Sequence, residues 1–293
     1  MAKVNSAPLI LRGREVADEV LKSVTSEINQ LKAQGKRLPG LAVVLVGNNP
    51  ASHTYVTNKE KACIKLGIHS EIHKLTASTS EPEVAKLIKS LNNNNKIDGI
   101  LIQLPLPSHI KIENIIEHLD PNKDIDGLHP YNLGKLFSLQ NCLTPCTPLG
   151  IMEMLKYYSI NVSGMSATVI GRSTLVSKPV SMLLLRENAT VTITHSKTEN
   201  IEEITKSADI LICAIGKPKL VKKHWIKSNA VVIDVGINKI NENGIEKICG
   251  DVDFEDVSTD CQAITPVPGG IGPVTIAMLM KNTLQAYKIR TNI

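Results

Sequence analysis

The sequence predicts a protein of two α/β domains, the second built on a doubly wound parallel sheet, with a cleft between the domains. The chain has 293 residues, which is more than a single hydrophobic core usually supports. Short continuous apolar runs, such as Leu41–Val46, are typical of parallel strands covered on both faces. These runs alternate with segments of helical spacing, once before residue 147 and again after it, which is the pattern of βαβ units.

The first series of elements starts with a helix predicted over Glu15–Ala33, which ends near Gly35, a residue suited to a helix C-terminus. The strand Leu41–Val46 comes next. Beyond it we expect helices over 52–66 and 81–91 and strands over 71–75 and 99–102.

The second series starts at Thr147 and Pro148, where Thr147 is suited to cap a helix and Pro148 to occupy its first turn. A rigid loop is expected over Pro266–Pro273, with Pro273 placed to open the final helix. Between the two, strands are expected over 167–170, 190–194, 210–214 and 230–235.

Composition limits the classes of function. Hydrophobic residues make up 42% of the chain and charged residues 21%, as in ordinary soluble globular proteins. The lysines behind the net charge of +5 are scattered and aromatic residues make up only 3%, so we expect no nucleic-acid partner. We recognise no secretion signal or membrane span and expect no membrane partner. The six cysteines form no C-x-x-C pair, and His69 and His73 lack a third ligand at metal spacing; we therefore expect a reducing cytoplasm and no metal site.

A phenol, an amine, an amide and a carboxylate are the candidate functional groups of the first domain. Tyr55 and Lys59 are four residues apart and so share one face of the predicted helix. Gln103 follows a buried strand, where a polar side chain points into the crevice in which open α/β sheets bind ligands. Asp126 supplies the carboxylate. Singly, such a lysine is usually a solvated surface charge and such a glutamine a loop contact, but their combination favours a ligand site.

A dinucleotide-binding turn is predicted at Gly171–Pro179, directly after one strand and before a helix. In such a turn, backbone N–H groups and a helix N-terminus face a pyrophosphate. The segment departs from the G-x-G-x-x-G pattern, because only Gly171 is glycine and Ser173 and Ser177 occupy the later positions.

The residues after the next strand favour NADP over NAD. An NAD-binding protein usually places an Asp or Glu there against the ribose hydroxyls, whereas this chain has His195, Ser196, Lys197 and Thr198. Arg172 and Ser196 can donate hydrogen bonds to a 2′-phosphate, which a carboxylate would repel. On these residues alone, a polar loop without a ligand stays open as an alternative.

With these motifs assembled, the chain resembles the bifunctional methylenetetrahydrofolate dehydrogenase/methenyltetrahydrofolate cyclohydrolase family essentially from end to end. One position departs from the family, since Ser177 stands where glycine is typical. A serine is costly there if the backbone angle is one that only glycine adopts. The resemblance is carried by residues 55–62, 103–107, 123–127, 145–148, 232–238 and 266–273.

The resemblance implies two linked reactions on one folate, within the tetrahydrofolate interconversions that serve purine, methionine and histidine biosynthesis. NADP takes a hydride from the methylene bridge of 5,10-methylenetetrahydrofolate, and water then adds to the 5,10-methenyl cation to yield 10-formyltetrahydrofolate. The resemblance further implies a folate-binding catalytic domain over 1–147 plus 273–293, a Rossmann-like NADP-binding domain over 148–272, and a homodimer.

The resemblance also assigns roles to single residues. Lys59 exchanges protons with water and the leaving nitrogen, beside Tyr55, while Gln103 hydrogen-bonds to Lys59 and tunes it. Burial beside a cationic substrate lowers the pKa of such a lysine. Asp126 binds the amino and ring N–H groups of the pterin. The implied substrate-binding residues are Tyr55, Asp126, Pro268, Gly269 and Gly270, and the implied cofactor-binding residues are Gly171, Arg172, Ser173, Ser196 and Ile237.

Two other functions are compatible with parts of this pattern. A dehydrogenase without hydrolytic activity would share the fold, but the presence of Tyr55, Lys59 and Gln103 argues against it. A non-catalytic NADP-binding or scaffold module would need no polar cluster at the strand ends of the first domain.

Overall fold

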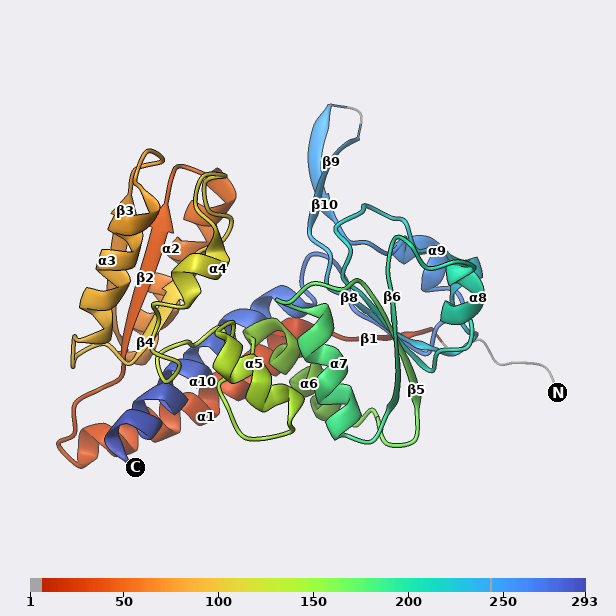
Figure 1. Cartoon of the computed structure of the whole chain (residues 1–293). Coiled ribbons are helices and arrows are strands. Elements are labelled where there is room, and N and C mark those ends of the chain that lie inside the picture. Colours follow the sequence, from red (N-terminus) through yellow and green to blue (C-terminus); the bar gives the residue numbers. More distant parts are fainter. Residues whose placement is uncertain (1–6, 243) are drawn as a thin grey trace. The chain divides into compact units, whose positions relative to one another are not determined.

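The chain forms two units, each an α/β structure with a parallel sheet, which confirms the prediction of two α/β domains (Figure 1). The computed structural model describes residues 7–242 and 244–293. The six-stranded unit comprises residues up to Ala17 together with Thr147–Thr275, and the three-stranded unit comprises Asp18–Cys146 together with Ile276–Ile293. Two long helices, α1 (Gly13–Ala33) and α10 (Ile271–Thr291), contribute residues to both units.

The three-stranded unit is built around strand β2, whose seven residues are all buried. On one face of the sheet, Ala42, Val44 and Val46 belong to a cluster with residues of α3 and α4, such as Ile88 and Ile115. Successive side chains of a strand point to opposite faces, so a strand covered on both sides reads as a continuous apolar run. In sheet order the strands are β3 (His69–Leu75), β2 (Gly40–Val46) and β4 (Gly99–Ile102), and the helices are α2 (Pro50–Leu66), α3 (Glu81–Asn92), α4 (Ile112–Ile116) and α5 (Pro130–Phe137).

The six-stranded unit has a parallel sheet in which β6 and β7 lie on opposite sides of β5. The strand order thus reverses at β5, and such a reversal creates the crevice at which doubly wound sheets bind ligands. In sheet order the strands are β1 (Leu9–Ile10), β11 (Ala263–Ile264), β8 (Val231–Asp234), β7 (Ile210–Cys213), β5 (Ser166–Ile170) and β6 (Thr190–Thr194). The helices are α6 (Cys146–Tyr157), α7 (Ser177–Arg186), α8 (Ile201–Thr205), the 3-10 helix η1 (Lys223–Trp225) and α9 (Phe254–Val257).

Three features of this unit differ from the expectations. Residues 7–17 group with it because β1 pairs with β11, whereas the sequence-based division placed them in the other domain. Helix α6 begins at Cys146, so Thr147 lies inside its first turn, and the Thr147 hydroxyl hydrogen-bonds to that of Thr275 at 3.1 Å instead of capping the helix. An antiparallel hairpin of β9 (Asn238–Glu242) and β10 (Ile245–Cys249) was not expected, and it stands out from the sheet (Figure 1).

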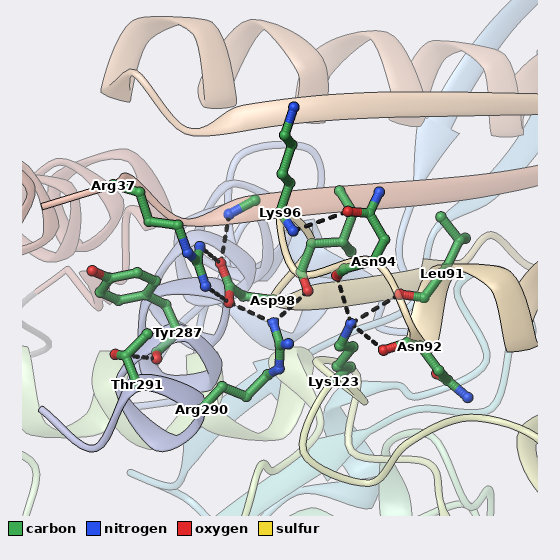
Figure 2. A network of polar contacts seen from close by, with 12 residues as sticks. Arg37, Leu91, Asn92, Asn94, Lys96, Asp98, Lys123, Tyr287, Arg290 and Thr291 are labelled. Carbon is green, nitrogen blue, oxygen red and sulfur yellow. Dashed lines mark hydrogen bonds and ion pairs between the residues drawn. The ribbon is translucent and has the colours of Figure 1, made fainter.

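A buried carboxylate ties the three-stranded sheet to two arginines (Figure 2). Asp98, which is fully buried, accepts two hydrogen bonds from Arg37, at 2.6 and 2.7 Å. It accepts further bonds from Arg290 of α10 at 2.7 Å and from the backbone N–H of Gly40 at 3.0 Å. A buried charge is tolerated when it is paired and hydrogen-bonded in this way. Asp98 therefore links the start of β2 and the last turn of α10 to the start of β4.

A buried lysine, three residues before Asp126 in the sequence, is bonded to three backbone carbonyl groups (Figure 2). Lys123, also fully buried, donates to the carbonyl oxygens of Leu91, Asn92 and Asn94 at 2.8, 2.7 and 3.0 Å. These carbonyls lie at the C-terminal end of α3, where a cation also complements the helix dipole. The backbone of Lys123 accepts a hydrogen bond from Ile100 of β4, so the ammonium anchors this segment beside the strand.

Replacing Lys123 by methionine should lower the free energy of unfolding by about 3 kcal/mol, because buried carbonyl groups lose their donor. Urea denaturation followed by circular dichroism measures the change. Lys86→Met, at an exposed position of the same helix α3, is the control and should change the free energy by less than about 0.5 kcal/mol. An equal effect of the two substitutions would contradict the anchoring role.

Candidate active site

The amine of Lys59 is held by an amide at the end of a buried strand. Nζ of Lys59 donates to Oε1 of Gln103 at 2.9 Å. Gln103 directly follows β4 and is buried, and its Nε2 donates to the carbonyl of Leu104 at 2.7 Å. The amide nitrogen is thereby committed to the backbone, so the amide oxygen faces the lysine. The structure therefore brings together two of the three predicted catalytic residues in direct contact.

Burial controls the protonation of this lysine and of the neighbouring carboxylate. It lowers the pKa of Lys59 below the ordinary value of 10.5, while Asp126 and Cys146 act in the opposite direction. Burial also raises the pKa of Asp126, against the influence of Lys59. Each group stabilises the charged form of the other, but for both groups removal from water is the larger effect. Burial therefore favours the neutral form of both groups relative to the same groups in water.

Tyr55 lies one turn before Lys59 on helix α2 and is half-buried. Burial raises its pKa above the ordinary value of 10.0. The phenol therefore keeps its proton at neutral pH and can donate one hydrogen bond and accept another.

Cys146 and Asn282 complete the surroundings of Asp126, and the sequence assigned no role to either. The thiol of Cys146 is buried, and burial together with Asp126 keeps its pKa well above 9.0, so it stays neutral. Asn282 of α10 donates to the carbonyl oxygens of Ile125 and Thr144, both at 2.8 Å. These bonds fix the backbone next to Asp126. The Pro145–Pro148 motif contains Cys146, but nothing local marks Asn282, whose partners are more than 130 residues away.

The predicted dinucleotide turn lies between β5 and α7. Gly171 has φ of 128°, and a Cβ there would overlap the carbonyl oxygen of Ala214, so glycine is required. The hydroxyl of Ser173 accepts hydrogen bonds from the backbone N–H groups of Val176 and Ser177, each at 3.2 Å. Ser173 thus satisfies two of the free donors at the start of α7.

The serine that departs from the family pattern fits this turn without strain. Ser177 is the first residue of α7, is fully buried, and is not among the residues with positive φ. Its hydroxyl lies beside Gly171 and 3.4 Å from the hydroxyl of Ser173. The expected cost of a backbone angle reserved for glycine is therefore absent.

The two residues predicted to bind a 2′-phosphate follow neighbouring strands. Ile170 pairs with Thr194 in the parallel register of β5 and β6, and Gly171 donates to the carbonyl of Thr194 at 2.8 Å. Arg172 directly follows Gly171, and Ser196 comes two residues after Thr194. Both side chains are exposed. They therefore emerge from one edge of the sheet, where an anion can reach both.

The other predicted ligand residues of the six-stranded unit follow β8 and β11. Ile237 is exposed after β8. Pro268 and Gly269 are exposed in the loop after β11, and Gly270 is buried. The carbonyl of Gly269 accepts a hydrogen bond from Gly13 at 2.8 Å, which fastens this loop to the start of α1. The substrate-binding residues predicted from the sequence are thus divided, with Tyr55 and Asp126 in one unit and residues 268–270 in the other.

Two classes of feature are absent from residues 7–242 and 244–293. No group of three or more His, Cys, Asp or Glu side chains there is placed to hold a metal ion. Over the same residues, no helix has the length and apolar character needed to cross a bilayer.

Comparisons with known proteins agree with the motifs. The model of the tetrahydrofolate dehydrogenase/cyclohydrolase catalytic domain matches residues 11–126, and the model of the NAD(P)-binding domain of the same family matches residues 145–291. A protein of Campylobacter hominis named bifunctional protein FolD is 52% identical over 281 residues, 96% of this chain and 98% of that protein. A protein of the same name from Nitratiruptor sp. is 50% identical over 281 residues, again 96% of this chain and 98% of that protein.

Solved structures give the same result. The bifunctional enzyme FolD of Campylobacter jejuni, a methylenetetrahydrofolate dehydrogenase/cyclohydrolase, superposes with a TM-score of 0.93 at 43% identity, covering 97% of this chain and 100% of that one. The Trypanosoma brucei enzyme FolD, solved with NADP and an inhibitor, superposes with a TM-score of 0.94 at 35% identity, covering 98% and 100%. The resemblance read from the motifs is confirmed, and the chain belongs to the tetrahydrofolate dehydrogenase/cyclohydrolase family.

Proposed function

We propose that Lys59 moves the proton in a two-step conversion of reduced folate by this bifunctional, NADP-dependent enzyme of one-carbon metabolism. The first step oxidises 5,10-methylenetetrahydrofolate to the 5,10-methenyl cation, and the second hydrolyses this cation to 10-formyltetrahydrofolate. Membership of the family and the relatives named FolD support both activities. The observation that carries the role of Lys59 is its contact with Gln103 at a buried strand end.

Hydrolysis requires a group that accepts a proton from water and returns one to the leaving nitrogen. A neutral amine can do both, and burial already lowers the pKa of Lys59 toward that form. A cationic substrate beside it favours the neutral amine further, because like charges repel. The oxygen of Gln103 accepts a hydrogen bond from the amine in either protonation state, so it holds Nζ in place through the proton transfer.

The carboxylate of Asp126 suits the amino and ring N–H groups of a pterin. Two such donors can match its two oxygens in a bidentate pair. Burial raises the pKa of Asp126, and donors from a bound pterin would favour its ionised form again. Tyr55, which keeps its proton, is a neutral hydrogen-bonding group near Lys59 on the same helix.

The six-stranded unit fits a dinucleotide at the strand ends described above. Gly171 allows the connection at Ala214 to pack closely against this turn, and the N-terminus of helix α7 follows the turn. Arg172 and Ser196 provide donors for a 2′-phosphate at a position without a carboxylate. When bound, NADP supplies the hydride acceptor, and the contribution of the chain to that step is to bind and orient.

A homodimer and a cytoplasmic location are further parts of the proposal. In the six-stranded sheet, β6 is an edge strand with Ile193 exposed, and β10 exposes Ile245 and Ile248. Edge strands and exposed apolar side chains favour pairing with a second copy. The six cysteines are all free thiols, as expected in a reducing compartment.

Replacing Lys59 by glutamine should reduce cyclohydrolase activity at least 100-fold, because the hydrolytic step loses its proton carrier. Dehydrogenase activity should fall by less than about tenfold, since hydride transfer needs no proton relay. Hydrolysis of methenyltetrahydrofolate and reduction of NADP with methylenetetrahydrofolate are measured separately. Lys61→Gln, at an exposed position of the same helix, is the control. Equal loss of both activities would show that Lys59 only positions the substrate, and a wild-type protein without NADP reduction would refute the proposed function.

The cyclohydrolase rate should increase with pH along a limb centred below pH 10.5, the ordinary pKa of lysine. The sign follows from the mechanism, because the protonated amine is inactive as a base and the neutral amine prevails only above its pKa. Initial rates measured across this pH range test the prediction. In Lys59→Arg the guanidinium stays charged throughout, so a limb that persists unchanged in this variant would exclude Lys59 as its source.

Replacing Ser196 by aspartate should lower the preference for NADP over NAD by about tenfold, which corresponds to about 1.4 kcal/mol. The new carboxylate would repel a 2′-phosphate and accept hydrogen bonds from the ribose hydroxyls of NAD. The ratio of kcat/KM for the two cofactors measures the preference. Ser207→Asp, an exposed position before β7 at the amino-terminal ends of the parallel strands, is the control. An unchanged ratio in Ser196→Asp would remove this residue from the cofactor site.

A further inference from the structure

Asp251 is a buried carboxylate that receives hydrogen bonds from two loops. Its Oδ2 accepts from the backbone N–H groups of Ile215 and Gly216 at 2.7 and 3.1 Å. Its Oδ1 accepts from the backbone of Lys217 and from Nδ2 of Asn238, both at 2.9 Å. Asp251 is fully buried. Four donors fill the acceptor positions of its two oxygens, so the side chain is suited to be a carboxylate and not an amide.

The first of these loops lies against the predicted dinucleotide turn. Residues 215–217 follow β7, the strand next to β5. Ala214, which begins the connection, approaches Gly171 so closely that a Cβ on Gly171 would overlap its carbonyl oxygen. The backbone that Asp251 organises is therefore in direct contact with the turn expected to meet the pyrophosphate.

The second loop carries Ile237, which the family resemblance implies binds the cofactor. Ile237 is flanked by Gly236 and Asn238, and Asn238 donates to Asp251. A Cβ on Gly236 would overlap the carboxyl group of Asp251. The carboxylate therefore packs against the backbone on one side of Ile237 and hydrogen-bonds to the side chain on the other.

A second buried carboxylate fixes Asp251 itself. Oδ1 of Asp234 accepts from the backbone N–H groups of Asp251 and Gly236, both at 3.0 Å, and Oδ2 accepts from Val252 at 2.9 Å. Asp234 is the last residue of β8 and is buried. A rigid strand end thus holds Asp251, and Asp251 in turn holds the loops after β7 and β8.

We propose that Asp251 is a positioning residue for the dehydrogenase reaction, which fixes residues 215–217 and 236–238 in the arrangement that binds the dinucleotide. This inference rests on the proposed function, because it assumes that the cofactor meets these loops. Asp251 itself is buried behind the backbone and acts through the N–H groups that it orients. Its contacts all lie in the six-stranded unit, so its loss should affect the NADP-dependent activity and spare the hydrolytic one.

The test is Asp251→Asn, which keeps the size of the side chain and turns an amide N–H₂ toward backbone donors. The KM for NADP should rise at least tenfold and the dehydrogenase kcat should fall at least tenfold. Cyclohydrolase activity on methenyltetrahydrofolate, measured without NADP, should stay within twofold of the wild type. Asp253→Asn is the matched control, because Asp253 lies two residues further on and pairs with Lys222 near the surface; it should change neither activity more than twofold.

Two outcomes would overturn the proposal. One is a parallel loss of both activities in Asp251→Asn, which would indicate general support of the fold and not positioning of the cofactor loops. The other is a KM for NADP and a dehydrogenase kcat that both stay within twofold of the wild type. If the wild-type protein reduces no NADP, the proposed function fails instead.

Discussion

A parallel sheet ends its strands at a common edge, and at that edge backbone N–H and C=O groups must find partners outside the ladder. In the six-stranded unit, side chains supply these partners. The hydroxyl of Ser173 serves the start of α7, and the carboxylates of Asp234 and Asp251 serve the loops after β7 and β8. These hydrogen bonds restrict the conformations that the loops can adopt. The shape of the proposed cofactor site therefore depends on the side chains that accept hydrogen bonds from the backbone beyond the strand ends.

In the three-stranded unit, the residue that follows a strand end positions the amine of Lys59. Gln103 continues from β4 and directs its oxygen at Lys59, because its nitrogen already donates to a backbone carbonyl. A carboxylate in place of Gln103 would stabilise the ammonium and raise the lysine pKa, whereas a neutral amide holds the amine without that effect. Asp126 is near enough to interact electrostatically with Lys59, and burial still dominates the pKa of both groups. The site thus lowers the pKa of the Lys59 amine while fixing its direction.

Much of this arrangement was predictable from local sequence. The apolar runs of β2, β4 and β5 indicated buried parallel strands, and Gln103 and Gly171 follow two of them directly. The hairpin β9–β10 was missed because its strands are largely polar and stand away from the sheet, so burial leaves no pattern in them. The two-residue strands β1 and β11 are too short to be periodic.

The supporting residues of the sites could not be predicted in the same way. Asn282 and Asp251 act through partners that the fold brings to them, over separations of up to 157 residues for Asn282. A buried polar residue of this kind has the same local signature as an exposed one, since its neighbours along the chain do not reveal its contacts. Ser177 shows the converse, because the cost expected for a serine depended on a backbone angle that only the structure could give.

The hydrogen bond from Arg290 to Asp98 makes the structure sensitive to removal of the last residues of α10. Arg290 lies in the last turn of α10 and also donates to the carbonyl of Ile97 at 2.6 Å, two residues before β4 begins. Proteolytic trimming that removed it would leave the buried carboxylate with Arg37 as its remaining side-chain partner among the described residues and would expose a strand start to water. Because β4 leads into Gln103, clipping a few terminal residues would loosen the support of Lys59 without changing either Gln103 or Lys59.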